Sequence, residues 1–304
     1  MAVHLSVCIA TYRRLDRLHL LLEDLGKQTL LPNEIVIIDN DATGSARQVV
    51  EKFKASGCPF HLIYDIQPER SISITRNLTV HRSSGEWLAF VDDDERAPPE
   101  WLQRLMDAAL QHKAESVLGP VEPVVPDTAP EWIRRGKFYD WPHLATGEVV
   151  HSSNLRFGNI LIAGAPLRAL EGPFDPAFGL STGEDREMLM RLADNGAKII
   201  WCDEAPVFEP VEEKRLSLAW LLQRAYSGGQ YFGRLVITGR LGHSTKFSVA
   251  RQGLLWCIQS AVALMFASIS WPLGRDRAAY WLIKAWANGG KLSAFLGWRY
   301  GEYA

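Results

Sequence analysis

Short apolar runs alternate with longer amphipathic runs over the first 113 residues, and this alternation leaves few folds open. We interpret four apolar runs as buried strands, at 4–10, 34–40, 60–66 and 86–94. The segments between them have the periodicity and the start and stop residues of helices, at 15–28, 45–56 and 71–84. The pattern predicts an α/β fold with a mostly parallel sheet flanked by helices, in which ligands bind at the carboxyl ends of the strands.

Composition narrows the class of protein. Of the 304 residues, 47% are hydrophobic, which is enough for a substantial core. The formal net charge of −2 provides no basic field for nucleic acid, so we expect no nucleic-acid partner. The four cysteines lie far apart in the sequence, which argues against a zinc site or a disulfide framework. The amino terminus runs directly into the first predicted strand, so we expect the catalytic part in the cytoplasm.

An acidic run ends the fourth predicted strand, where Asp92, Asp93, Asp94 and Glu95 are consecutive. Alternate residues of a strand share a face, so if the pleat persists to the end of the run, Asp92 and Asp94 are expected on one side and Asp93 on the other. A hard divalent cation such as Mg²⁺, which uses one or two carboxylates plus substrate phosphates, would offset the repulsion among these acids. The alternative is a solvated loop whose acids cap the helix that follows near Pro98.

A second acidic pair, Glu184 and Asp185, opens a predicted helix at 184–196. Helix capping accounts for Glu184, because acidic side chains are favourable at the positive end of a helix. It accounts less well for Asp185. Beside a metal–diphosphate site, this carboxylate is suited to act as a general base on an attacking hydroxyl.

Five segments carry a resemblance to a known family: VCIATYRR (7–14), IVIIDND (35–41), SISITRN (71–77), FVDDDE (90–95) and FGLSTGEDREM (178–188). In this order and spacing they resemble the inverting glycosyltransferases of family 2. These enzymes have the GT-A fold, and the likeness is greatest to bacterial exopolysaccharide transferases that act on lipid-linked oligosaccharides. The resemblance covers residues 3 to 235.

The resemblance implies a role for individual residues on the donor side. The turn after the first strand, with Ala10, Thr11 and Arg13, resembles the segment that contacts the nucleotide. The residue that recognises the base or ribose corresponds to Asp39. On the phosphate side, the pair that ends the family's helix motif corresponds to Arg76 and Asn77, although Ser71, Ile74 and Thr75 stand where the family often has Gly and Ala.

The resemblance also implies the metal and the base. Asp92 and Asp94 match the DxD motif that binds Mg²⁺ or Mn²⁺ on the sugar-nucleotide diphosphate, and we place Asp93 with the donor-binding residues. Asp185 matches the catalytic base. The QxxRW motif of processive synthases is missing, which favours a single addition. Arg224 could reach the departing diphosphate, or it is a solvated helix arginine.

The middle of the chain is rich in proline and aromatic residues. Closely spaced prolines at 120–132 predict an irregular loop over the site. Three aromatic residues in or near it could stack on a sugar ring, with core or lid packing as the alternative: Trp132, Tyr139 and Trp141.

The carboxyl-terminal region differs in kind. Residues 252–274 carry no charge and are long enough to cross a bilayer, and the segment after them mixes tryptophans with lysines and arginines as interfacial helices do. We therefore predict a transferase domain at 1–235 and a helical, membrane-associated tail at 236–304. The tail is expected to lie in or dip into one leaflet at the cytoplasmic face of the inner membrane. The alternatives are a buried helical hairpin and a true span.

These observations predict transfer of a sugar from a nucleotide-diphosphate donor, a UDP-sugar by family resemblance, with inversion at the anomeric carbon. The expected acceptor is a hydroxyl of a polyprenyl-diphosphate-linked saccharide in surface polysaccharide biosynthesis. Two alternatives remain open at this point. The same carboxylates could serve a glycoside hydrolase, which needs neither nucleotide nor metal, or the chain could bind sugar nucleotides without catalysis.

Overall fold

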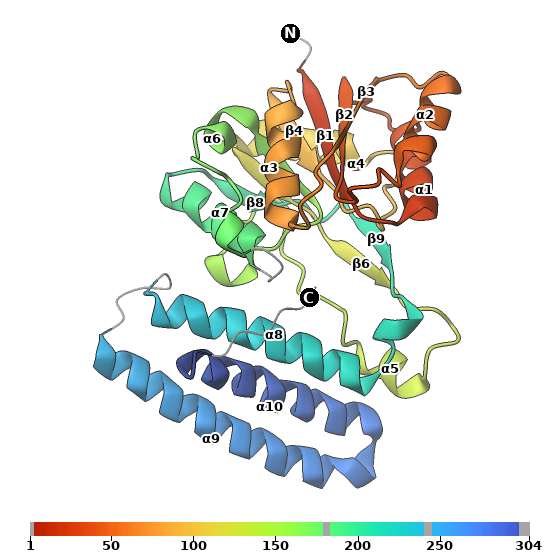
Figure 1. The fold of residues 1–304 in the computed structure, drawn as a ribbon. Helices are drawn as coiled ribbons and strands as arrows, with labels where there is room; N and C mark the ends of the chain where they lie inside the picture. The colour runs from red at the N-terminus through yellow and green to blue at the C-terminus, as the bar shows by residue number, and fades with distance from the viewer. Residues whose placement is uncertain (1–2, 179–182, 240–244, 298–304) are drawn as a thin grey trace. The chain divides into compact units, whose positions relative to one another are not determined.

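The computed structural model describes residues 3–178, 183–239 and 245–297, and its ribbon is shown in Figure 1. The chain packs into two compact units. The first unit is Met1–Val124 with Trp141–Pro210, and the second is Val125–Asp140 with Val211–Ala304. The predicted domain boundary, between residues 235 and 236, falls inside helix α8 (Leu218–Ile237), whose residues pack in the second unit.

A seven-stranded sheet forms the centre of the first unit. Its strands are β1 (Leu5–Thr11), β2 (Glu34–Asp39), β3 (His61–Ile66), β4 (Trp87–Phe90), β5 (Ser116–Leu118), β7 (Ile160–Ala163) and β8 (Ile199–Trp201). The order across the sheet is β3-β2-β1-β4-β7-β5-β8. Strand β7 runs antiparallel to both of its neighbours, and the other pairs are parallel. The predicted α/β fold with a mostly parallel sheet is confirmed.

Helices cover both faces of this sheet (Figure 1). They are α1 (Leu15–Leu25), α2 (Arg47–Ala55), α3 (Ile72–Arg82), α4 (Trp101–His112), α6 (Gly164–Arg168) and α7 (Glu184–Asp194), with 3-10 turns at Ser152–Asn154 and Pro176–Phe178. Helix α3 begins where Ser71 accepts a hydrogen bond from the Ile74 amide. Helix α7 begins after Gly183, whose positive φ of 113° suits glycine at this entry.

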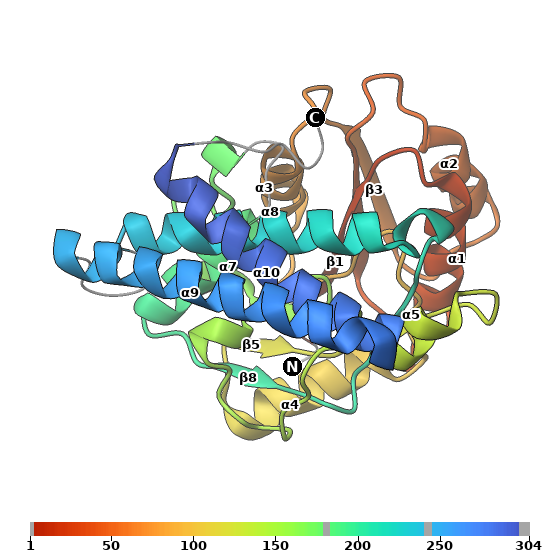
Figure 2. The same cartoon turned by 90° about the horizontal axis from the view of Figure 1, so that it is seen from below.

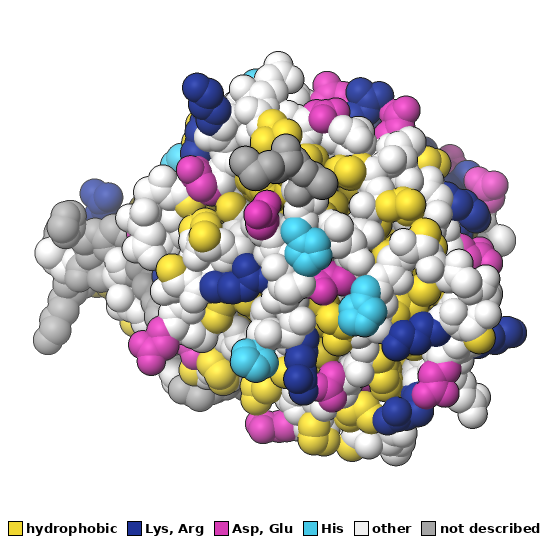
Figure 3. All heavy atoms as spheres, turned by 90° about the horizontal axis from the view of Figure 1, so that it is seen from above, with side chains coloured by type: hydrophobic (Ala, Val, Ile, Leu, Met, Phe, Trp, Pro, Cys, Tyr) yellow, Lys and Arg dark blue, Asp and Glu magenta, His cyan; other side chains and the backbone are white. Residues whose placement is uncertain are grey.

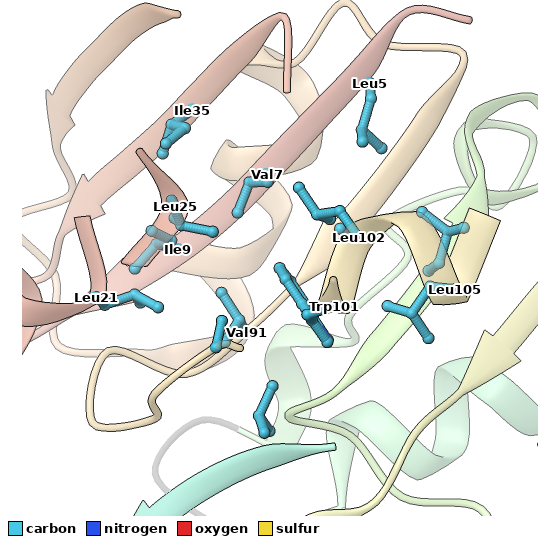
Figure 4. Packing of buried hydrophobic residues seen from close by; sticks show 14 of the residues in the cluster. Leu5, Val7, Ile9, Leu21, Leu25, Ile35, Val91, Trp101, Leu102 and Leu105 are labelled. Carbon is cyan, nitrogen blue, oxygen red and sulfur yellow. The ribbon is translucent and has the colours of Figure 1, made fainter. Parts of the chain in front are cut away.

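Alternating side chains of β1 build two separate cores. Leu5, Val7 and Ile9 point toward α1 and α4, where Trp101 is almost fully buried (Figure 4). Cys8 lies in the core on the opposite face. The alternation follows from the two-residue period of a strand that is buried on both sides. This double burial explains why the strand reads as a nearly continuous apolar run.

The expectation of an irregular segment at 120–132 is wrong. Strand β6 (Val121–Val124) pairs in parallel with β9 (Val207–Pro210), and helix α5 (Glu131–Gly136) begins directly after Pro130. The two strands form a separate two-stranded sheet in which β6 is an edge strand, while Phe208 of β9 also forms an antiparallel bridge with Arg96. Pro123 lacks an amide hydrogen, and an edge tolerates that loss.

The second unit is helical. Besides α5 and α8 it contains η3 (Glu213–Arg215), α9 (Lys246–Ser270), η4 (Trp271–Leu273) and α10 (Arg275–Phe295). Helix α10 packs against α8 and α9, and the three run side by side in Figures 1 and 2. Glycines allow α8 and α10 to approach closely, because a Cβ on Gly229 would lie 2.0 Å from the carbonyl oxygen of Ala287.

Charged side chains of both signs are interspersed on the face shown in Figure 3, among hydrophobic and neutral surface. No basic stripe crosses this face. Proteins that bind nucleic acid concentrate basic residues on one face. The expectation of no nucleic-acid partner stays a prediction, and the mixed charge of this face does not contradict it.

Candidate active site

The candidate site lies where β1 and β4 end. These parallel strands are neighbours, so Thr11 at the end of β1 and the acids that follow β4 lie at one edge of the sheet. The hydroxyl of Thr11 donates to Asp93 Oδ2 at 2.8 Å. The adjacency follows from the strand order, and it places the predicted nucleotide turn beside the predicted metal motif.

Arg76 is the central cation of the site. Its Nη1 donates to Glu184 Oε1 at 2.7 Å and lies 3.9 Å from Asp185 Oδ2, and its Nη2 donates to Asp92 Oδ1 at 3.3 Å. The guanidinium is buried and lies 4.3 Å from the ring centroid of Phe157. One arginine of α3 therefore joins the acidic run after β4 to the acidic pair that opens α7.

The three aspartates have different partners. Asp93 accepts from Arg14 Nη1 at 2.8 Å, and Asp94 Oδ2 lies 3.0 Å from the same nitrogen and 3.5 Å from Arg17 Nη1. The side chain of Asp92 is 46% exposed, and among the described residues its one ion-pair partner is Arg76, at Oδ1. Asp92 thus keeps an oxygen available to a ligand, whereas Asp93 and Asp94 face the arginines that open α1. The expectation that Asp92 and Asp94 share one side is wrong, because β4 ends at Phe90 and the strand alternation does not extend to these residues.

Burial makes the ionised form of several carboxyl groups in this cluster unfavourable. Burial raises the pKa of Asp94 to about 7, with the charges of Asp92 and Asp93 adding to the shift against Arg14. Burial also raises the pKa of Asp93 and raises that of Glu95 well above its usual range. Such shifts mean that a further positive charge would stabilise the ionised carboxylates.

The donor set suits a divalent ion that also binds substrate phosphate. Within the described ranges, no three His, Cys, Asp or Glu side chains converge as a complete metal centre. Asp92 and Asp94 supply at most two carboxylates, which is the number that Mg²⁺ typically takes when phosphates complete its shell. The excess negative charge and this partial ligand set both fit Mg²⁺ or Mn²⁺.

Glu95 is buried and holds the backbone of Asp92 in place. Its Oε2 accepts the backbone amide of Asp92 at 2.9 Å, and the residue is 2% exposed. Gly158 borders the same carboxyl group, because a Cβ there would lie 2.9 Å from Glu95 Oε1, and its φ of 108° already favours glycine. The sequence suggested helix capping for Glu95, and the structure instead gives it a buried role behind Asp92.

The pair at the start of α7 divides into a buried and an accessible acid. Glu184 is buried against Arg76, while the side chain of Asp185 is 29% exposed. Burial and the neighbouring charge of Asp185 raise the pKa of Glu184 to about 7 despite Arg76. Of the two acids, Asp185 is the one that a substrate can reach.

Two other residues that were predicted to bind the sugar-nucleotide donor form hydrogen bonds within the protein. Asp39 is fully buried and accepts from the Tyr64 hydroxyl at 2.9 Å and the Ala46 amide at 2.8 Å, so it shapes the loop after β2. Asn77 donates to the carbonyl of Phe174 at 2.7 Å and accepts from the amide of the same residue at 2.9 Å. Both side chains therefore order backbone beside the site.

Arg13, Ala10 and Arg224 occupy three different environments. Arg13 has a positive φ of 56° and pairs with Asp41 at 2.7 Å. Ala10 is half-buried in β1. Arg224 belongs to α8 in the second unit, so its proposed contact with the leaving group stays a prediction. In the motif FGLSTGEDREM, residues 179–182 lie outside the described ranges.

Sequence reasoning missed several residues that the structure brings to the site. Arg14 and Arg17 face the aspartates, and their spacing of three at the start of a helix is a usable signal for one shared face. The guanidinium groups of Arg13 and Arg70 each lie 5.2 Å from the ring centroid of Tyr12. Phe157 could not be predicted from the sequence, because it lies in an irregular segment before β7 and belongs to no motif or periodic pattern.

Comparison with known proteins identifies the family. The model of the family described as glycosyl transferase family 2 matches residues 6–162. The succinoglycan biosynthesis protein ExoM of Rhizobium meliloti is 34% identical over 300 residues, which cover 97% of this chain and 94% of ExoM. The chain belongs to glycosyl transferase family 2.

Solved structures agree on the fold of this glycosyltransferase. Mannosyltransferase PcManGT from Pyrobaculum calidifontis, in complex with GDP-Man and Mn²⁺, aligns with a TM-score of 0.67 at 15% identity over 98% of this chain and 89% of that one. Residues 1–349 of S. aureus TarS, in complex with UDP-GlcNAc, align with a TM-score of 0.54 at 17% identity over 98% and 93%. The predicted GT-A fold is confirmed.

Proposed function

We propose that this glycosyltransferase moves a sugar from a UDP-sugar to a hydroxyl of a polyprenyl-diphosphate-linked saccharide during exopolysaccharide synthesis. The observation that carries the proposal is the position of Arg76 between Asp92 and Asp185. This arrangement places a partly exposed acid on each side of one buried cation. Similarity to ExoM supports the exopolysaccharide setting. The TarS and PcManGT complexes support a nucleotide-sugar donor, and the choice of UDP rests on the family resemblance.

The proposed reaction is a single displacement with inversion. Asp185 takes the proton of the acceptor hydroxyl while that oxygen forms a bond to the anomeric carbon. The bond from this carbon to the diphosphate oxygen breaks on the opposite face, and the nucleoside diphosphate leaves with the electron pair. Asp92 and Asp94 would hold a divalent ion, which supplies Lewis-acid stabilisation of the negative charge on the leaving group. Arg76 keeps Asp92 and Asp185 oriented toward the reacting atoms.

Calorimetric titration with UDP, with and without Mn²⁺, tests the donor side. We expect Mn²⁺ to strengthen UDP binding and Asp94→Asn to remove that gain, while Asp185→Asn binds UDP as the parent protein does. The hydrolase alternative requires no nucleotide, so absence of binding by UDP, GDP and dTDP in every condition would reject the transferase proposal. An exposed acid of α4, Asp107, offers the control variant Asp107→Asn.

The raised pKa of Asp94 predicts that metal binding depends on pH. Below about pH 7 this carboxyl group is largely protonated, and a cation must displace the proton. The affinity for Mn²⁺ should fall by up to about tenfold for each unit of pH below 7 and level off above it. Mn²⁺ titrations at about pH 6, 7 and 8 measure this. Equal affinity at the lowest and highest of these values would contradict a role for Asp94.

The membrane part of the proposal depends on α9. The stretch Ser248–Leu273 has a mean hydropathy of 1.7 over its most apolar window, of which 22% is buried, and by length and composition it could cross a bilayer. Its exposed apolar residues include Leu254, Ile258, Val262, Met265 and Ile269, which recur every three or four residues. This spacing describes one face of a helix, and the opposite face is used by α10. We propose that this face lies in the cytoplasmic leaflet of the inner membrane.

Co-sedimentation with lipid vesicles tests this surface. The double change Ile258→Asp and Met265→Asp puts two carboxylates on the exposed face of α9, and we expect about tenfold or greater loss of binding to phosphatidylcholine–phosphatidylglycerol vesicles. Leu110, which is comparably exposed on α4, provides the control Leu110→Asp. Equal binding by the double variant and the parent would contradict the proposal.

A further inference from the structure

A second group of polar and aromatic side chains lies in the first unit, outside the site described above. This Trp141 cluster consists of Glu122, Trp141, His143, Arg156, Trp201 and Asp203. The guanidinium of Arg156 lies 5.3 Å from the ring centroid of Trp141 and 4.6 Å from that of Trp201. Trp201 is buried, whereas Trp141 is 58% exposed. One indole is therefore part of the core, and the other is open to a ligand.

Arg156 keeps donor capacity that the protein does not use. Its Nη2 donates to the Pro142 carbonyl at 3.2 Å, but its Nε is buried without a hydrogen-bond partner. The structure shows no ion pair for Arg156 within the described ranges, and burial lowers its pKa to about 10. The nearby carboxylates are held instead by His143, which lies 2.7 Å from Asp203 and 3.1 Å from Glu122. Charged side chains are almost never fully buried unless they are paired, so a guanidinium with only a structural role would be expected to pair with one of these carboxylates.

The cluster is joined to the side of the active site where Asp185 lies. Arg156 is followed by Phe157, whose ring contacts Arg76, and by Gly158, which borders Asp92 and Glu95. On the other side, Arg186 follows Asp185 and donates to the Ser152 carbonyl at 2.7 Å. The chain segment that carries Arg156 is thus bound to both halves of the catalytic arrangement.

Sheet order separates this cluster from the predicted nucleotide turn. Trp201 ends β8, at one edge of the sheet, while the predicted donor residues end β1 and β2, near the other edge. Strands β4, β7 and β5 lie between β1 and β8. A molecule that contacts the cluster therefore lies three strands away from the predicted nucleotide turn. This position favours the acceptor over the nucleotide as the ligand.

The chemistry of the cluster suits a saccharide. The apolar face of a pyranose ring packs on an indole, and its hydroxyls bond to guanidinium and carboxylate groups, so sugar sites combine aromatic surface with a few placed polar groups. We propose that Trp141 and Arg156 form a binding subsite for a saccharide unit of the acceptor, with Glu122 and Asp203 as hydroxyl acceptors. The inference rests on the proposed transferase function and assigns the acceptor side of that site.

Fluorine NMR of protein labelled with 5-fluorotryptophan tests this subsite directly. The probes are cellobiose, laminaribiose, gentiobiose and lactose, each added in the presence of UDP and Mn²⁺. The Trp141 resonance is assigned by its loss in Trp141→Phe. We expect at least one disaccharide to shift this resonance in a saturable manner in the parent protein.

Saturation-transfer NMR on variants measures how much Trp141 and Arg156 each contribute to the affinity for the disaccharide. We expect about tenfold or greater weakening of disaccharide binding in Trp141→Ala and in Arg156→Leu, and a smaller loss in Trp141→Phe, which keeps an aromatic face. UDP affinity should stay at the parent value in all three. Trp286 of α10 is also an exposed indole, and Trp286→Ala serves as the matched control.

The outcomes separate this subsite from the proposed function. If UDP binds but no disaccharide does, or if Trp141→Ala binds the disaccharide as tightly as the parent, the subsite is rejected and the transferase proposal stands. If neither UDP nor any disaccharide binds the parent, both proposals fail. If a disaccharide binds and shifts other tryptophan resonances but not that of Trp141, the acceptor lies elsewhere.

Discussion

Asp185→Asn is expected to lower turnover by about 10²- to 10⁴-fold while leaving the affinity for UDP unchanged. Asparagine keeps the size of the side chain and its place in the first turn of α7, but it cannot take a proton from the acceptor. The accessible position of Asp185, beside buried Glu184, is the reason to expect the base here. Steady-state rates with a lipid-linked acceptor, and UDP titration on the same samples, measure the two quantities.

Asp194 provides the matched control for this experiment. It is an exposed carboxylate at the last residue of the same helix, so Asp194→Asn changes the same charge far from the proposed chemistry. We expect parent activity from this control. Asp185→Asn with more than a tenth of parent turnover would show that another group removes the proton.

Arg76→Met is expected to lower the free energy of unfolding by about 3–5 kcal/mol, because removing one partner of a buried ion pair leaves the other charge uncompensated. Glu184 would lose a hydrogen bond of 2.7 Å while staying buried. Urea denaturation of the first variant, and of Arg76→Met combined with Glu184→Gln, measures the coupling. The double variant should recover part of the loss, since a neutral amide is less costly to bury than a carboxylate.

The pH dependence of this loss gives an independent check. The pKa of Glu184 is raised to about 7 in the folded protein, so the cost of its burial is small where the carboxyl group is protonated and grows as pH rises through that value. Without Arg76 the pKa rises further. The destabilisation by Arg76→Met should therefore be larger near pH 8 than near pH 5, and a loss under about 1 kcal/mol at both would contradict a buried ion pair.

Much of the first unit could be predicted from local pattern. Strands β1 to β4 were readable because parallel strands that are buried on both faces form nearly continuous apolar runs. The acids at 92–95 were readable as a site because they end such a strand. The β6–β9 pair was missed, since pairing between residues about 86 apart, Val121 with Val207, leaves no periodic trace and prolines pointed the other way.

The sequence by itself determined the element types of the first 113 residues, the order of the family motifs, the acids at 92–95 and 184–185, and the uncharged stretch at 252–274. Only the tertiary structure decided which charges meet. Arg76 reaches Glu184 across 108 positions of sequence, and Arg14 reaches Asp93 across 79. The physical reason is that helix and strand patterns arise from neighbours within a turn, whereas these pairs depend on how strands order in the sheet and how α3 and α7 pack beside it.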